Sequence, residues 1–125
     1  MVESSRRVWA TIDSGALKKN LVIVSELCPN SKIFPVVKSN AYGHGVDKIA
    51  TVALGSSPNV VGLAVATTQE AVELHNLELG CRILLMNGFV NQEELLEYMK
   101  TNKFQKCNYR NFSNGIISIH SGWKV

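Results

Sequence analysis

The sequence has no long hydrophobic run. No stretch of about 18 consecutive apolar residues occurs, so we expect no transmembrane helix. Two arginines, Arg6 and Arg7, lie near the N-terminus, but Asp13 interrupts the short apolar segment behind them. A secretory signal peptide needs an apolar region at that place, so we expect no signal peptide. Together these absences predict a cytoplasmic protein.

Cysteine is also scarce, and charge is close to balanced. The three cysteines and three histidines are widely spaced, so they predict neither a disulfide framework nor a set of metal ligands. The formal net charge is +3, and the basic residues after position 105 are too sparse for a nucleic-acid-binding patch. We therefore expect no bound metal and neither nucleic acid nor membrane as a partner.

The composition that is present is that of a folded globular domain, with 46% hydrophobic and 18% charged residues. Apolar runs of strand length alternate with amphipathic segments of helix length. Ser14 can cap the first helix, Thr67 and Glu70 have capping-box spacing before the third, and Gly80 fits that helix's C′ position. We expect strands at 8–13, 33–37, 60–65 and 83–86 and from 104, and helices at 15–28, 46–55, 69–79 and 92–101.

Strands and helices that alternate over short connections predict an α/β fold with parallel strands. About four βα units would form the N-terminal half of a (β/α)8 barrel, and a small open doubly wound sheet is the alternative. Periodicity does not choose between the two. The pattern stops after residue 105, where acidic residues end. In that tail Ile116, Ile117 and Ile119 predict one short strand without a following helix.

The residues that point to chemistry lie at 35–45. Lys38 ends an apolar strand, and the carboxyl ends of barrel strands form the usual active-site mouth. An amine in apolar surroundings loses its proton more readily and can then attack a carbonyl. Lys38 taken alone nevertheless favours the alternative, a lysine that snorkels at a sheet rim. Gly43 and Gly45 permit close approach of a ligand, and Tyr42 adds a hydroxyl. The next helix offers N–H groups to a phosphate, so the set predicts a pocket for an aldehyde cofactor.

Residues 36–45 read VVKSNAYGHG, which resembles the pyridoxal-phosphate attachment motif of alanine racemases. The usual family form is VVKANAYGHG, so Ser39 makes the one departure, and it is conservative. Residues 9–13, Trp-Ala-Thr-Ile-Asp, are similar to the family's opening W-A-E-I-D. Residues 83–89 resemble its third barrel strand and loop. The resemblance extends over residues 7–105.

The resemblance implies an enzyme that uses pyridoxal 5′-phosphate (PLP) to interconvert L-alanine and D-alanine, the latter for peptidoglycan. It implies a TIM-type barrel of PLP fold type III, in which Lys38 holds the cofactor and serves as one of two acid/base groups. Tyr42 would hydrogen-bond the cofactor phosphate, Met86 would lie beside its ring, and His44 would shape the loop. The family is homodimeric, so the implied partners are alanine and a second copy of the chain.

Other parts of the family have no recognisable counterpart in this sequence. Alanine racemases carry the second base, a tyrosine, on a C-terminal β domain, and later barrel strands add a histidine and an arginine near the ring. We therefore expect residues 1–105 to be part of the N-terminal barrel domain, 106–125 to be a divergent tail, and the C-terminal β domain to be absent. The tail is either an out-of-frame end or a divergent linker, which the coding DNA beyond codon 105 would distinguish.

Half a barrel leaves unpaired strand edges, so we expect this chain to self-associate and to have little or no racemase activity alone. Three hypotheses follow: a fragment of an alanine racemase, a non-catalytic PLP-binding module, and an inert truncated product. A visible absorbance band on addition of PLP, lost in Lys38→Ala, would exclude the inert product. The sequence does not distinguish alanine from serine or another small amino acid as the substrate.

Overall fold

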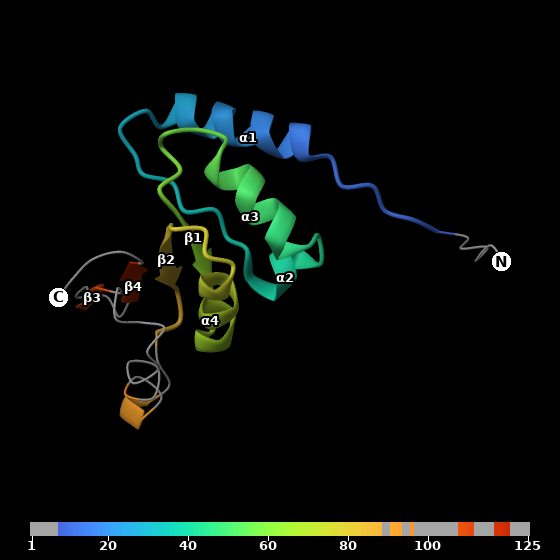
Figure 1. The fold of residues 1–125 in the computed structure, drawn as a ribbon. Coiled ribbons are helices and arrows are strands. Elements are labelled where there is room, and N and C mark those ends of the chain that lie inside the picture. Colours follow the sequence, from blue (N-terminus) through green and yellow to red (C-terminus); the bar gives the residue numbers. More distant parts are fainter. Residues whose placement is uncertain (1–7, 89–90, 94–95, 97–107, 112–116, 121–125) are drawn as a thin grey trace, which may run out of the picture.

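The computed structural model describes residues 8–88, 91–93, 96, 108–111 and 117–120. They form an α/β fold in which α1 packs on α3, and α4 lies against the strands (Figure 1). Its elements are α1 (Ser14–Leu27), α2 (Lys38–Tyr42), α3 (Val46–Leu54), β1 (Gly62–Val65), α4 (Thr68–Asn76), β2 (Arg82–Leu85), β3 (Asn108–Asn111) and β4 (Ile117–His120).

The strand predicted at 8–13 is wrong. These residues form no strand and lead away from the helices as an extended segment (Figure 1). Trp9 is 80% exposed and Val8 is similarly uncovered. Strand-forming side chains favour a strand only where a neighbouring strand and a covered face are available, and this segment has neither within the described residues.

Helix α1 agrees with the prediction in extent but has a different N-cap. The carboxylate of Asp13, and not the hydroxyl of Ser14, accepts a hydrogen bond from the Ala16 N–H at 2.9 Å. The helix therefore begins one residue earlier than expected. Of its apolar stripe, Leu21 is buried against the core, whereas Leu27 at the last turn is exposed.

Helix α4 has the predicted capping box but ends sooner than predicted. The Thr67 side chain accepts from the Glu70 N–H, and the Glu70 carboxylate accepts from the Thr67 N–H. The helix ends at Asn76, and Glu78 takes the left-handed conformation, with φ of 54°, that we expected at Gly80. Gly80 is also left-handed, but in the turn that leads to β2.

The segment 33–37 runs parallel to β1, as predicted, but does not form a regular strand. It is joined to its neighbour by isolated bridges, including Val36 with Ala64. Pro35 has no N–H to donate, which interrupts the ladder. The segment is covered unevenly, since Val37 is 3% exposed, Phe34 is half-buried and Val36 is 38% exposed. The prediction of burial on both faces is therefore wrong.

Strands β1 and β2 are parallel, with Leu63 opposite Ile83, and the sheet order is β1-β2-β4-β3. Strand β4 pairs antiparallel with β2, and β3 pairs antiparallel with β4. The short strand predicted near Ile117 is thus confirmed, whereas β3 was not predicted. Residues 92, 93 and 96 are helical, as expected for the helix at 92–101. The rest of that helix and the strand expected from 104 lie outside the described residues.

The core lies between the parallel strands and the helices. Small side chains on α3, Ala50 and Ala53, let this helix approach closely, and both are fully buried. None of the described helices is long and apolar enough to cross a membrane. The largest fully buried side chains all come from β1 and β2: Leu63, Val65, Ile83 and Leu85.

Candidate functional site

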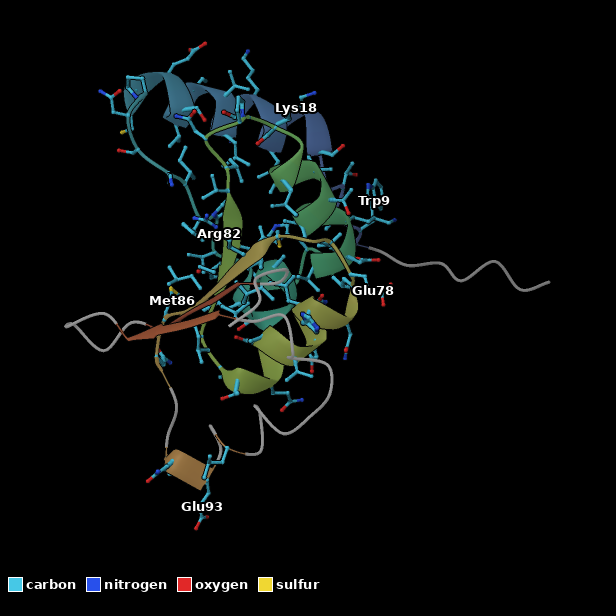
Figure 2. The ribbon with its side chains drawn as sticks, turned by 60° about the vertical axis from the view of Figure 1, so that its left-hand side comes forward. Trp9, Lys18, Glu78, Arg82, Met86 and Glu93 are labelled. Carbon is cyan, nitrogen blue, oxygen red and sulfur yellow. The ribbon has the colours of Figure 1, made fainter. Side chains whose placement is uncertain are left out.

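Lys38 lies at the carboxyl end of the parallel strands. It directly follows the segment 33–37, just as Ala66 follows β1 and Met86 follows β2. Figure 2 shows Arg82 and Met86 at the two ends of β2, and the Met86 N–H extends the pairing by donating to the Val65 carbonyl at 2.9 Å. Carboxyl ends of parallel strands share one edge, so Lys38 and Met86 belong to the same edge of the fold. Lys38 is half-buried.

The turn that begins at Lys38 is left-handed. Ser39, Asn40 and Ala41 have φ between 51° and 55° and ψ between 46° and 50°, and Tyr42 also has a positive φ of 55°. This conformation costs an L-residue about 1–2 kcal/mol. A run of four such residues without glycine persists only where its surroundings hold it, and such strain is concentrated at functional sites.

Backbone and histidine contacts hold the turn from inside. The Ala41 N–H donates to the Val37 carbonyl at 2.9 Å, and the Gly43 N–H donates to the Ser39 carbonyl at 3.0 Å. The His44 Nδ1 lies 2.8 Å from the Ala41 carbonyl oxygen. Because a carbonyl only accepts, this ring nitrogen carries the proton. His44 therefore shapes the loop, in agreement with the sequence-based expectation.

Asn40 joins the turn to α3. Its side-chain Oδ1 accepts from the Val46 N–H at 2.9 Å, and its carbonyl accepts from the Gly45 N–H at 3.1 Å. We expected the start of α3 to offer its N–H groups to a phosphate. The first of them, at Val46, is instead bound within the loop by the Asn40 side chain, a contact that sequence reasoning missed.

The structure brings the two predicted site residues together. The Lys38 Nζ lies 5.9 Å from the centroid of the Tyr42 ring. A cation over an exposed ring is stabilised by about 0.5–1 kcal/mol, which favours this contact but does not make it rigid. Tyr42 is 57% exposed, so its hydroxyl is accessible to a ligand. An amine and a phenol are thus offered from the same side of one short turn.

Glu70 is the residue of this site that sequence reasoning assigned only to a helix cap. Its Oε2 accepts from the Ala66 and Thr67 N–H groups at 2.9 and 3.1 Å. Its Oε1 accepts from the Ser39 N–H at 2.8 Å, which connects α4 to the turn of Lys38. Partial burial raises the pKa of Glu70, but the hydrogen bonds outweigh it and hold the pKa below the ordinary 4.5. The capping-box spacing identified Glu70, but it gave no signal for the contact with Ser39.

The lowered pKa of Glu70 predicts a loss of stability in acid. A carboxyl group with a depressed folded-state pKa stabilises the fold above its unfolded pKa and loses that contribution as pH falls through the folded value. We expect urea unfolding to show wild type more stable than Glu70→Gln near pH 7. The difference should shrink towards zero as pH falls below 4.5. A difference in unfolding free energy that stays constant well below pH 4.5 would contradict the assignment.

Known proteins resemble this chain over most of its length. Residues 12–105 match a family model described as the N-terminal domain of alanine racemase. The chain belongs to the alanine racemase family. An alanine racemase of Haemophilus influenzae is 45% identical over 69% of this chain. A catabolic alanine racemase of Salmonella typhimurium is 31% identical over 97% of it, so that alignment extends beyond residue 105.

The solved structures of alanine racemases decide the architecture. The biosynthetic enzyme of Pseudomonas aeruginosa shares 36% identity with this chain, covers 69% of it and superposes with a TM-score of 0.59. The enzyme of Corynebacterium glutamicum superposes with a TM-score of 0.53 at 32% identity. The predicted fold class is confirmed: the chain forms part of a (β/α)8 barrel and not a doubly wound sheet. It spans about a quarter of the length of the curated relatives it matches.

Proposed function

We propose that this chain forms the PLP-binding part of an alanine racemase barrel, with Lys38 as the residue that holds PLP. The proximity of the Lys38 amine to Tyr42 at the carboxyl edge of the strands carries the proposal. Racemisation of alanine, action as a homodimer and a cytoplasmic location belong to the same proposal and rest on the family. The division into a barrel part at 1–105 and a tail at 106–125 is also proposed.

The donor set of the site fits PLP. This cofactor carries an aldehyde, which needs a primary amine, and a phosphate, which needs hydrogen-bond donors. Lys38 supplies the amine and is half-buried. Tyr42 supplies an accessible hydroxyl next to it. Within the described residues no cluster of His, Cys, Asp and Glu could hold a metal ion in its place.

Lys38 and Tyr42 have separate tasks in this proposal. PLP, when bound, withdraws electrons from the α-carbon of an amino acid. Lys38 holds the cofactor and, once its amine is released, takes or returns the α-proton on one face. Tyr42 donates its O–H to the phosphate and orients it. Lys38 and Tyr42 come from the same short turn, and Tyr42 would be engaged with the phosphate, so this pair would supply one acid/base group for the α-carbon. We therefore expect the chain alone to bind PLP with little or no racemisation.

Attachment of PLP to Lys38 tests the proposal directly. We expect incubation of the chain with PLP to give a visible absorbance band, and borohydride reduction to leave one PLP group on the peptide that contains Lys38. Lys38→Ala should lose the band and the labelled peptide. Lys48→Ala, which removes an exposed lysine of α3, is the matched control and should keep both. Labelling spread over surface lysines, equal in both variants, would contradict the proposal.

The same preparations separate the alternative functions. A chain that gives the Lys38 adduct but does not interconvert the alanine enantiomers is a non-catalytic PLP-binding module under those conditions. A chain that gives no adduct is inert towards PLP. The structural observation that favours the module for the chain alone is the one-sided placement of Lys38 and Tyr42.

A further inference from the structure

The residues on both sides of Lys38 are anchored to the same βα unit. On one side the Val37 N–H donates to the Ala64 carbonyl of β1 at 2.8 Å. On the other side the Ser39 N–H donates to the Glu70 Oε1 of α4 at 2.8 Å. Lys38 lies between these two anchors, so the direction of its Cα–Cβ bond depends on both.

Glu70 is itself held firmly. Its second oxygen accepts two further N–H groups, from Ala66 and Thr67, at the junction between β1 and α4. A carboxylate satisfies donors at both oxygens, whereas the amide of glutamine has one acceptor oxygen and one donor nitrogen. The link between Ser39 and the β1–α4 junction therefore needs a carboxylate. A glutamate is ionised at neutral pH, and the lowered pKa of Glu70 extends the ionised form to more acidic solution.

We propose that Glu70 is a positioning residue for Lys38, because its carboxylate ties the strained left-handed turn to the β1–α4 junction. Without this tie the turn loses an anchor at Ser39, the first of its left-handed residues. A strained backbone segment relaxes when its surroundings stop holding it. The Lys38 amine then samples more directions, and fewer of them suit attachment of PLP. This inference rests on the proposed function for its PLP readout.

The test compares Glu70→Gln with two matched variants. Thr67→Ala removes the hydroxyl, which caps the Glu70 N–H and also hydrogen-bonds the Glu70 carboxylate, and leaves the contact of that carboxylate with Ser39 in place. Glu73→Gln removes a neighbouring exposed carboxylate, which contacts Gln69, and controls for charge. We expect Glu70→Gln to weaken PLP binding, read from the absorbance band, about tenfold, the value of one charge-assisted hydrogen bond. Both controls should stay within about twofold, since they keep that bond.

A second readout does not use PLP. Amide hydrogen exchange at Ser39 should be faster in Glu70→Gln than in wild type and unchanged in Thr67→Ala and Glu73→Gln. In the wild-type chain, the NMR shift of the Ser39 amide should follow the titration of the Glu70 carboxyl group, a measurement that needs no variant.

The outcomes separate this inference from the proposed function. If wild type forms no Lys38 adduct, the proposed function fails, while the Ser39 exchange and titration still decide the positioning role. If Thr67→Ala weakens PLP binding as much as Glu70→Gln while exchange at the Ser39 amide keeps its wild-type rate, the effect comes from loosening α4, and the inference is wrong. Unchanged Ser39 exchange in Glu70→Gln, or a Ser39 shift that ignores the Glu70 titration, would also overturn it.

Discussion

Gly62→Ala is expected to cost about 3 kcal/mol of unfolding free energy, the upper part of the range for overpacking a core. A Cβ at this position of β1 would lie 2.6 Å from the Phe34 Cε1 and 2.8 Å from the Arg82 Cβ, and would also clash with the Arg82 carbonyl oxygen. That carbonyl belongs to β2, directly opposite Gly62 in the parallel register. Neither strand can move away without weakening the parallel pairing of β1 with β2.

Gly55→Ala is the matched control. A Cβ at Gly55 would lie 3.5 Å from the Thr51 carbonyl oxygen, which is ordinary van der Waals contact. Its φ of −85° suits any residue. Its cost should stay within about 0.5 kcal/mol, as for other unconstrained positions. Urea unfolding of both variants measures the difference, and equal midpoints would show that Gly62 is not a close-approach position.

The helices could be predicted well because their signals are local. The capping box of Thr67 and Glu70 lies within four residues, and the structure has it. Asp13 and Ser14 are both residue types that favour the N-cap position, so their identity does not decide between them. The predicted start of α1 was therefore wrong by one residue. The end of α4 was missed for the same reason, since Glu78 can take the left-handed position that favours glycine.

The strands were harder to predict because pairing depends on distant residues. The segment 8–13 has the composition of a strand but no described neighbour to pair with. The segment 33–37 does pair with β1, yet Pro35 breaks its ladder. Strand β3 is polar in sequence, and its pairing with β4 gives no period-2 signal. Apolar patterning therefore identified β1 and β2, which are buried, better than the strands beside them.

The candidate site, too, could be predicted from the sequence only in part. Lys38 and Tyr42 are identified by a long motif, and the structure brings them together. The left-handed turn has no glycine in its first four positions, so the preference of glycine for positive φ could not be used to predict it. The contact from Glu70 to Ser39 spans 31 positions of sequence. Such a contact becomes visible only when α4 and the turn are placed side by side.

The second large loss of stability is expected from a substitution at Ala41, in the left-handed turn. This side chain is 4% exposed and its residue has φ of 53° and ψ of 49°. A β-branched residue is strongly disfavoured in the left-handed region, and two added methyl groups overpack a buried site. We expect Ala41→Val to cost about 3 kcal/mol or more, a large part of the 5–15 kcal/mol typical of a domain. Urea unfolding measures this loss.

Ala41→Gly tests whether strain, and not burial alone, explains the effect. Glycine removes about 1–2 kcal/mol of left-handed strain. It loses about 0.5–1 kcal/mol through backbone entropy and about 0.8 kcal/mol through the missing methyl group. These contributions nearly cancel, so Ala41→Gly should unfold close to wild type and keep the Lys38 adduct. If both variants were destabilised equally, packing alone would matter at this position. If Ala41→Val were as stable as wild type and kept the adduct, the turn that presents Lys38 would not be left-handed.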